Sequence, residues 1–316
     1  MNGFSIKSAV VTGPTGAIGA ALCRRLLSDG ASVWAVVRPG SGRLFHLPEG
    51  VRAVSCGLDG MERLPALIGG RADAFFHLAW AGTTGPARED MPGQIGNIRA
   101  AVAAARAAAA LSCAVFVGAG SQAEYGRVDG ALRADTPCFP ESGYGMAKLC
   151  AGQMTRSECR RLGVRHVWAR VLSVYGPCDG EGTMISSVIR TLLAGGRPAL
   201  TAGGQLWDYL YADDAAQALC ALARAGRDGR VYPLGSGEAR PLRDYVVMLR
   251  DAIDPALPLG FGEVPYAPGQ IMRLEADIGD LIRDTGFRPQ TSFETGITET
   301  IRWHRAMRER VGQDTI

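Results

Sequence analysis

A glycine-rich segment near the N-terminus limits the folds open to this chain more than any other feature. The segment TGPTGAIG, residues 12–19, follows an apolar run that is typical of a buried strand and precedes a helix-compatible stretch, residues 20–28. Such a strand–loop–helix unit suits a dinucleotide pyrophosphate, because free backbone amides and the positive end of the helix dipole face the phosphates. The expected cofactor contacts come from Gly13, Thr15, Gly16, Ala17, Ile18 and Gly19.

The three glycines of this loop have separate expected tasks. Gly13 makes the tight turn, Gly16 lets the backbone approach the pyrophosphate, and Gly19 lets the helix pack against the sheet. Glycine supplies 42 of the 316 residues, nearly twice the usual share of about 7%. Since 47% of the residues are hydrophobic, the chain can bury a large core, and its glycines punctuate a folded chain.

Short apolar runs recur along the chain, with helix-like segments between most of them. The expected strands cover residues 9–11, 33–37, 51–55, 74–78, 114–117 and 167–171. This alternation predicts an α/β fold with a Rossmann-type, doubly wound parallel sheet. The length suits two closely packed parts.

The residues after the second expected strand bear on the choice of cofactor. Folds that prefer NAD usually carry Asp or Glu here, to accept hydrogen bonds from the ribose 2′-hydroxyl. This chain has Arg38, with Ser41 and Arg43 close behind, and a guanidinium suits a 2′-phosphate. The sequence favours NADP; in the alternative, Arg38 and Arg43 are surface residues and the cofactor is NAD. Asp59 either bounds the adenine or is a turn residue.

Three side chains form a candidate catalytic group. Tyr144 and Lys148 are four residues apart and share one face of a helix if this segment is helical. Because a nearby ammonium favours phenolate, we expect Lys148 to lower the pKa of Tyr144 and to allow proton exchange with a sugar or alcohol oxygen. Ser121 follows the fifth expected strand, where ligands bind in open α/β sheets. It either hydrogen-bonds the reacting oxygen or caps a turn.

Composition excludes several partners and compartments. A net charge of +3, from 34 basic and 31 acidic residues, is too weak and dispersed to indicate nucleic acid or a membrane as partner. The eight cysteines form no CxxC pair and have no histidine at ligand spacing, so we expect reduced thiols and no metal. Residues 1–7 lack a signal peptide's apolar segment, and no stretch suits a membrane helix. We expect a cytoplasmic protein.

An alanine-rich stretch within residues 93–112 has high helix propensity. Its small side chains permit close packing, either within the chain or, together with the helix that starts near Tyr144, against a partner subunit. We expect a homodimer.

The ordered motifs of the chain resemble those of the extended short-chain dehydrogenase/reductase family. Within it, the chain is similar to the NAD(P)-dependent nucleotide-sugar epimerases, dehydratases and reductases, and the resemblance runs through almost the whole chain. Besides Asn97, Ser121 and Tyr125-Gly126, the motifs are TGPTGAIG at 12–19, HLAW at 77–80, YGMAK at 144–148, ARVLSVYGP at 169–177, WDYLYADDAAQAL at 207–219 and PLGSGE at 233–238.

The resemblance implies two domains and further cofactor contacts. Residues 1–176 would form the NAD(P)-binding Rossmann domain, with 205–236 returning to it. Residues 177–204 and 237–316 would form a smaller C-terminal domain that binds the sugar nucleotide. Leu78 and Ala79 join the expected cofactor contacts.

The resemblance also implies the roles of the catalytic trio. Tyr144 would transfer the proton, Lys148 would tune it and hold the nicotinamide ribose, and Ser121 would orient the substrate oxygen. Hydride would pass between the nicotinamide and a sugar carbon, usually C4.

Departures from the family pattern narrow the chemistry. The 4,6-dehydratases carry an Asp-Glu pair after the serine or threonine, whereas Gln122 and Ala123 cannot ionise, which argues against dehydration. Ser173 stands where epimerases often have Asn. Trp207 stands where they often have Arg, so the usual contact with the nucleotide is in doubt.

The expected substrate contacts are therefore drawn from several segments. They are Ser121, Gln122, Ser173, Trp207 and Arg273. Trp207 either stacks on the base or sugar or is a core residue. Arg273, and less so Arg190, either replaces the missing phosphate contact or is a surface charge.

The expected function is NADP-dependent reduction of the keto group, at C4, of a 4-keto nucleotide sugar. NADPH would supply the hydride and Tyr144 the proton. The alternative is an NAD-dependent nucleotide-sugar 4-epimerase, and a further alternative is a regulatory dinucleotide-binding protein.

Overall fold

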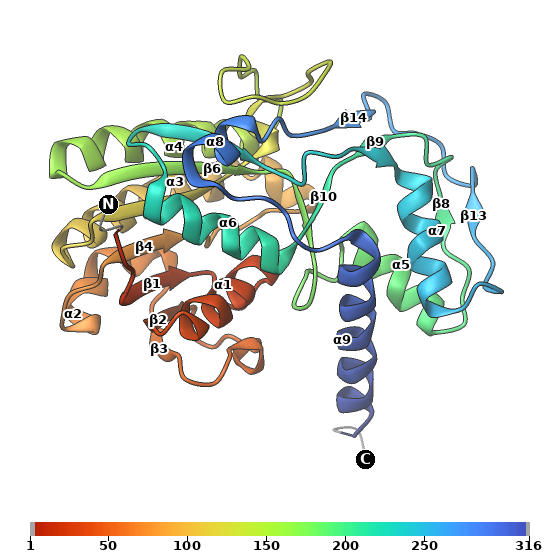
Figure 1. Ribbon diagram of the computed structural model, residues 1–316, viewed down its shortest axis with the longest axis horizontal. Helices are drawn as coiled ribbons and strands as arrows, with labels where there is room; N and C mark the ends of the chain where they lie inside the picture. Colours follow the sequence, from red (N-terminus) through yellow and green to blue (C-terminus); the bar gives the residue numbers. More distant parts are fainter. Residues whose placement is uncertain (1–3, 314–316) are drawn as a thin grey trace.

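A seven-stranded parallel sheet forms the centre of the computed structural model, which describes residues 4–313 (Figure 1). Residues 1–3 of the N-terminal segment and 314–316 of the expected C-terminal domain lie outside the described residues. The strand order is β11-β6-β5-β4-β1-β2-β3. The strands are β1 (Ser8–Thr12), β2 (Ser32–Val37), β3 (Arg52–Ser55), β4 (Ala74–His77), β5 (Val115–Ser121), β6 (Arg165–Val171) and β11 (Arg230–Leu234). The predicted Rossmann-type fold is confirmed.

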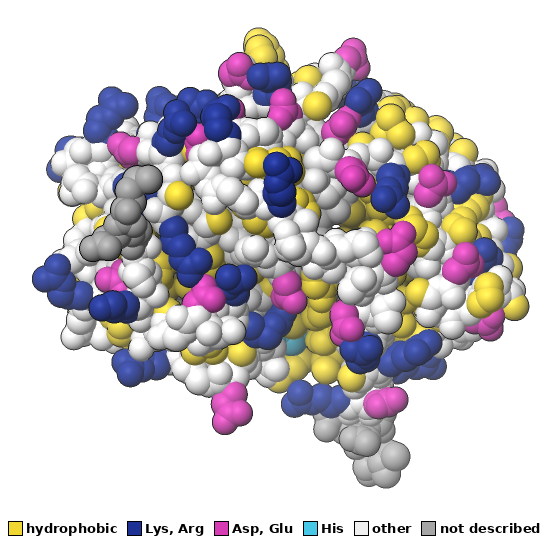
Figure 2. Space-filling model, viewed as in Figure 1, with side chains coloured by type: hydrophobic (Ala, Val, Ile, Leu, Met, Phe, Trp, Pro, Cys, Tyr) yellow, Lys and Arg dark blue, Asp and Glu magenta, His cyan; other side chains and the backbone are white. Residues whose placement is uncertain are grey.

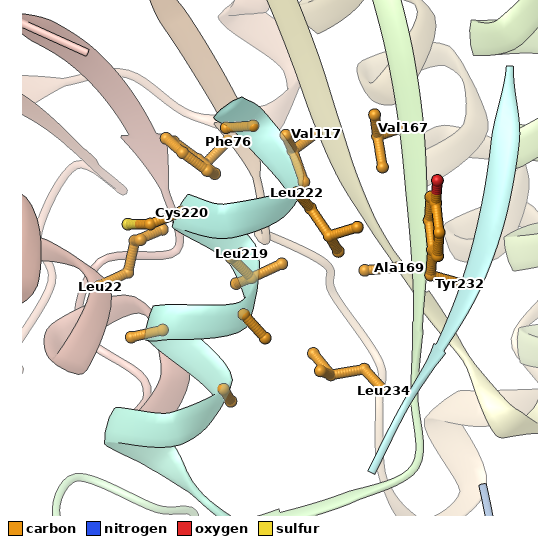
Figure 3. Packing of buried hydrophobic residues seen from close by; sticks show 14 of the residues in the cluster. Leu22, Phe76, Val117, Val167, Ala169, Leu219, Cys220, Leu222, Tyr232 and Leu234 are labelled. Carbon is orange, nitrogen blue, oxygen red and sulfur yellow. The ribbon is translucent and has the colours of Figure 1, made fainter. Parts of the chain in front are cut away.

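Helices cover both faces of this sheet, because successive residues of a strand point to opposite faces. Helices α1 (Ala17–Ser28), α6 (Ala212–Ala225) and α8 (Gly279–Thr285) pack on one face, and α2 (Leu64–Ile68), α3 (Met91–Ala110) and α4 (Gly143–Leu162) on the other. In Figure 3, Leu222 of α6 lies next to Val117 of β5, and Leu219, Phe76 and Val167 belong to the same cluster. The neighbouring residues Phe75 and Phe116 face the α3 side. The sheet is thus buried between two helical layers.

Two element boundaries differ from the sequence expectation. Helix α1 begins at Ala17, earlier than the expected Ala20. Strand β5 continues past Val117 to Ser121, although it contains two glycines. A Cβ on Gly118 or Gly120 would lie 2.2 or 2.3 Å from the Trp168 side chain of β6, so the bare backbone accommodates this indole. The longer strand brings Ser121 to the carboxyl edge of the sheet.

A second group of elements has a hydrophobic core of its own. It contains α5 (Met184–Leu193), α7 (Leu242–Ile253) and α9 (Phe293–Gln313), whose buried side chains include Ile189, Leu249 and Ile297. Three small sheets accompany these helices: β7 (Ser173–Tyr175) with β10 (Tyr209–Tyr211), β12 (Arg240–Pro241) with β9 (Leu206–Trp207) and β14 (Arg273–Leu274), and β13 (Gly260–Phe261) with β8 (Ala199–Leu200). The boundaries expected for a substrate domain stay a prediction.

The chain crosses between the two groups of elements more than once. After β6 it forms β7, α5 and β8 to β10, then returns through α6 to β11 at the edge of the main sheet. It leaves again for α7, and α8 packs once more against α6. Figure 1 shows α5, α7, β8 and β13 on the side away from β1 to β4.

Basic and acidic side chains are mixed over the face drawn in Figure 2, and several basic side chains lie side by side at its upper left. Apolar side chains gather at its upper right, where Figure 1 places β9, β14 and α7. No helix among residues 4–313 is both long enough and apolar enough to cross a membrane.

Candidate active site

The expected phosphate loop lies at the point where the sheet order reverses, between β1 and β4. Thr12, the last residue of β1, accepts hydrogen bonds through Oγ1 from the backbone amides of Leu78 and Ala79, both at 3.1 Å. Gly13, at φ +70°, follows directly, and a Cβ there would lie 2.9 Å from the Ala79 nitrogen. The structure thus brings together the loop and the residues after β4. Open α/β sheets bind ligands in such a crevice.

Gly19 and Gly16 differ in what surrounds them. A Cβ on Gly19 would lie 2.1 Å from the Gly13 carbonyl oxygen, so the fold itself requires glycine there. A Cβ on Gly16 would come no closer than 3.9 Å to another atom, and Gly16 has φ −88°, which any residue adopts. The fold therefore leaves an open cradle above Gly16, at the N-terminus of α1, of the kind that a phosphate fills.

The residues expected near the adenosine end of the cofactor are exposed. Arg38 follows β2, and Asp59 lies in the first turn of a 3₁₀ helix, Leu58–Arg63. Arg43 is exposed too, but its Nη2 donates a hydrogen bond to the Cys178 carbonyl at 2.7 Å. Arg38 is thus the better placed of the two arginines for a ligand. His46, not foreseen from the sequence, hydrogen-bonds the Thr15 carbonyl of the loop at 2.8 Å.

Ser121, Tyr144 and Lys148 come together at the carboxyl end of β5. Tyr144 lies in the first turn of α4, whose N-cap Ser142 accepts a hydrogen bond from the Gly145 amide at 3.1 Å. Ser121 caps the 3₁₀ helix Gln122–Glu124, accepting from the Ala123 amide at 3.2 Å. Lys148, one turn after Tyr144, is buried, and its Nζ donates to the Ala119 carbonyl at 2.7 Å. Local capping and helix periodicity therefore position the trio.

Burial controls the ionisation of these groups. It raises the pKa of the Tyr144 phenol, an effect opposed by the Ser121 side chain and by the Arg88 charge and increased by the Glu124 charge. Burial lowers the pKa of Lys148 to about 7, against the influence of Glu124. The expectation that Lys148 lowers the pKa of Tyr144 was wrong for this structure. Its Nζ lies 5.8 Å from the centre of the phenol ring and only 3.9 Å from that of Trp80.

Glu124 is buried, and its carboxylate is fully engaged in hydrogen bonds within the protein. Its carboxylate accepts hydrogen bonds from the Ser121 amide at 2.8 Å, from the Trp168 indole at 3.0 Å and from Arg170 Nε at 2.6 Å. The side chains of Glu124 and Arg170 are 0% and 4% exposed. Gln122, which is partly exposed, is uncharged. Among residues 122–124, Glu124 is thus the one ionisable side chain, and it is paired with Arg170.

Two of the expected substrate residues contact each other. Trp207 Nε1 donates to Ser173 Oγ at 2.8 Å. Trp207 also lines a pocket of about 330 Å³ whose other walls are largely apolar and carry no charged side chain: Met184, Ala199, Leu200, Thr201, Gln205, Tyr209, Leu242, Val264 and Gln270. Arg273 is exposed and pairs with Glu275 at 2.6 Å, and Arg190 pairs with Glu181 at 2.8 Å. Both arginines are thus already paired within the chain.

Sequence reasoning assigned no role to Trp80 and did not consider Arg88. Trp80 meets the Tyr144 ring edge-to-face with 6.2 Å between centroids, and its indole donates to Gln94 at 2.9 Å. Arg88 lies over the Tyr144 ring. Trp80 belongs to the HLAW motif, but nothing in the motif indicates a contact with Lys148. Arg88 lies in a short 3₁₀ helix, Gly85–Glu89, and the sequence around it shows no apolar periodicity that would indicate this.

Comparison with known proteins agrees with this geometry. The family model described as the NAD dependent epimerase/dehydratase family matches residues 9–235. The chain belongs to this family. A curated relative, the dTDP-glucose 4,6-dehydratase of Shigella flexneri, is 29% identical over 178 residues. That match covers 54% of the chain and 49% of the relative, so the match spans about half the length of such relatives.

Solved structures of similar proteins cover nearly the whole chain. The UDP-N-acetylglucosamine 4-epimerase of Methanobrevibacter ruminantium M1 superposes with a TM-score of 0.86 at 24% identity, over 96% of this chain and all of that one. MoeE5, solved in complex with UDP-glucuronic acid and NAD, has a TM-score of 0.82 at 27% identity, covering 95% of this chain and 99% of that one. The fold of the epimerase/dehydratase family therefore extends beyond the residues that the family model matches.

Proposed function

We propose that this chain is an NADP-dependent oxidoreductase that reduces the keto group, at C4, of a 4-keto nucleotide sugar. The observation that carries the proposal is the convergence of Ser121, Tyr144 and Lys148 at the carboxyl end of β5, two strands from β1, which the glycine loop follows. The open cradle at Gly16 fits a pyrophosphate, which would lie against the N-terminus of α1. When bound, the reduced dinucleotide supplies a hydride. Family membership supports a dinucleotide-dependent enzyme, and similarity to nucleotide-sugar enzymes supports the substrate class.

The protein's own residues perform the proton chemistry. Since burial raises the pKa of Tyr144, its phenol is protonated at neutral pH and serves as proton donor to the carbonyl oxygen. Ser121 polarises that oxygen, and Lys148 holds the cofactor ribose. A donor held protonated suits reduction, whereas oxidation of a sugar hydroxyl needs a base first. Leu78 and Ala79 would contact the cofactor, and Gln122, Ser173, Trp207 and Arg273 the substrate.

The preference for NADP rests on Arg38. Its exposed guanidinium follows β2, where an NAD enzyme usually carries an acid. Asp59 would lie beside the adenine. The alternative is an NAD-dependent nucleotide-sugar 4-epimerase, which the NAD bound to MoeE5 favours. Dehydration is disfavoured, because Gln122 is uncharged and Glu124 is paired with Arg170.

We further propose a cytoplasmic homodimer. A reducing compartment suits the eight cysteines, none of which forms a disulfide. The partner would cover the outer faces of α3 and α4, where Ile95, Met146 and Met154 are 51%, 49% and 47% exposed.

The direct test combines NADPH with 4-keto sugars carrying UDP, dTDP, GDP or CDP and follows NADPH oxidation. Turnover should collapse in Tyr144→Phe, with little change in NADPH affinity. The control is Tyr232→Phe. The Tyr232 hydroxyl donates a hydrogen bond to Asp284, which lies in the helical layer on the opposite face of the sheet. If no keto sugar is reduced by the wild-type protein, the proposal fails.

The cofactor is tested separately. Arg38→Asp should shift preference from NADPH towards NADH, whereas Arg71→Asp, an exposed arginine of a distant loop, should not. Stoichiometric NAD released on denaturing the purified protein would favour the epimerase instead.

A further inference from the structure

Arg88 lies against the proposed proton donor and has no part in the function described above. Its guanidinium carbon is 4.4 Å from the centre of the Tyr144 ring. Its Nη1 donates a hydrogen bond to the Thr83 carbonyl at 3.2 Å. The ring quadrupole attracts a cation at this distance. Arg88 therefore holds one face of the phenol ring, while Trp80 meets the ring edge-to-face.

The segment that carries Arg88 is fastened to both neighbouring helices. Gln94 of α3 donates through Nε2 to the carbonyls of Gly82 and Ala87, at 2.9 and 3.0 Å. The carboxylate of Glu89 accepts a hydrogen bond from the Gly143 amide of α4 at 3.0 Å. Gly143 directly precedes Tyr144. Hydrogen bonds on either side of Arg88 thus set its position relative to the phenol.

Two cationic side chains, Arg88 and Lys148, lie near Tyr144, and they differ in their distance from its ring and in their charge at neutral pH. Arg88 is the closer to the ring, at 4.4 Å against 5.8 Å for Lys148 Nζ. The Lys148 ammonium is also engaged by Trp80 and the Ala119 carbonyl. A guanidinium stays charged across the working pH range, whereas burial lowers the pKa of Lys148 to about 7.

The acids around Tyr144 do not neutralise the positive charge of Arg88, because each of them is engaged elsewhere. Glu124 acts on the phenol from β5's end but is paired with Arg170. Glu89 is hydrogen-bonded to the first turn of α4. Arg88 is therefore the constant positive charge beside the phenol.

We propose that Arg88 is a positioning residue that fixes the Tyr144 ring and stabilises its phenolate. This inference rests on the proposed reduction. There, the carbonyl carbon gains a hydride from the reduced nicotinamide, the O–H bond of Tyr144 breaks, and its proton goes to the carbonyl oxygen. The negative charge left on the Tyr144 oxygen is then offset by the adjacent guanidinium.

The first test needs no substrate. The Cζ resonances of isotope-labelled tyrosine are titrated in the cofactor-free protein, and Tyr144→Phe identifies the signal. Arg88→Gln should raise the pKa of Tyr144 by about one, since an opposite charge within a few ångströms has at least that effect. In Arg88→Lys the pKa of Tyr144 should stay close to the wild-type value. Arg99 is an exposed arginine of α3, and Arg99→Gln should not change the pKa of Tyr144. An unchanged pKa in Arg88→Gln would overturn the inference.

The second test is kinetic. In NADPH-dependent reduction, Arg88→Gln should lower kcat about tenfold, the equivalent of one pKa unit, and leave KM nearly unchanged. A raised KM with an unchanged kcat would make Arg88 a substrate contact and overturn the inference. If the titration shifts as expected but no keto sugar is reduced, the electrostatic role of Arg88 stands and the proposed reaction fails. Thermal melting of each variant checks folding, and Arg88→Met, which also removes the charge, serves if Arg88→Gln is unstable.

Discussion

The indole of Trp207 donates a hydrogen bond to the hydroxyl of Ser173 over 2.8 Å. The two residues lie on β9 and β7, in different small sheets, and Trp207 also lines the apolar pocket. The hydrogen bond therefore orients the indole between the pocket and the carboxyl end of the main sheet. By the resemblance noted above, Trp207 stands where epimerases often have Arg, and it is fixed in place by Ser173, which stands where they often have Asn.

Ser173→Ala should weaken binding of the nucleotide sugar about fivefold, because a hydrogen bond contributes about 1 kcal/mol net. Isothermal titration calorimetry measures this, and NADPH affinity should not change. Ser187→Ala, an exposed serine of α5, is the matched control. Equal substrate affinity in wild type and Ser173→Ala would reduce the Ser173–Trp207 pair to a structural contact.

Binding of NADPH should take up a proton above neutral pH. Burial lowers the pKa of Lys148 from 10.5 to about 7, so the free protein loses this proton as the pH rises through 7. The cofactor ribose that Lys148 would hold accepts hydrogen bonds from the ammonium and so favours it, and affinity should fall as the pH rises from 7 towards 10. Calorimetry in buffers of different ionisation enthalpy counts the proton. Lys148→Met should abolish the uptake, and uptake that persists in this variant would assign it to another group.

Lys148 also makes the stability of the folded protein depend on pH over the same pH range. Its pKa is lower in the folded than in the unfolded chain, so the unfolded chain binds more protons between the two values. Its unfavourable contribution is complete below pH 7 and disappears as the pH rises to 10.5. Lys148→Met should therefore stabilise the cofactor-free protein more at pH 6 than at pH 10, as measured by urea unfolding.

Gly16→Ala should separate folding from cofactor binding. A Cβ at Gly16 meets no atom closer than 3.9 Å, so we expect a stability change within about 0.5 kcal/mol, or a small gain from a less flexible unfolded chain. NADPH binding should fail, because the methyl group occupies the space of the phosphate. Gly19→Ala is the contrasting variant: its Cβ would lie 2.1 Å from the Gly13 oxygen, so the protein itself should be destabilised. Urea unfolding and cofactor titration together distinguish the two.

Glu124→Gln should destabilise the protein by about 3 kcal/mol, because it leaves the guanidinium of Arg170 buried without a countercharge. Urea unfolding of the cofactor-free protein measures the loss. In Glu124→Gln with Arg170→Met, much of it should be recovered, since no buried charge remains. A double variant whose loss equals the sum of the single losses would contradict this account of the pair.

Met154→Glu should convert the expected dimer to a monomer. The substitution places a charge on the outer face of α4, which the proposed partner covers, and light scattering should report half the mass. Met272→Glu, at a methionine of similar exposure outside α3 and α4, should leave the mass unchanged. A wild-type protein that is already monomeric would rule out the dimer.

Features local to one element could be predicted from the sequence. The glycine spacing at residues 12–19 and the four-residue spacing of Tyr144 and Lys148 need only a strand, a turn and a helix to acquire meaning. The order of apolar runs likewise predicted the parallel sheet, because each run is short and is followed by a helical segment.

Features that depend on packing between distant segments could not be predicted. The ionisation of Tyr144 results from burial competing with the charges of Arg88 and Glu124, and no spacing along the chain ranks these effects. Likewise, Lys148 contacts Trp80 rather than the phenol only because the segment that follows β4 brings Trp80 against α4. The length of β5 depended on Trp168, a residue of the next strand.

Strand β11 is the last strand of the main sheet to be synthesised, and this order bears on folding during translation. On the ribosome, the first six strands of the sheet emerge before the elements from β7 to β10, and β6 stays an open edge until residue 234 has been synthesised. An unpaired edge strand is a template for pairing with other chains. Nascent chains that stall between residues 172 and 229 should therefore be the aggregation-prone species and the natural clients of chaperones.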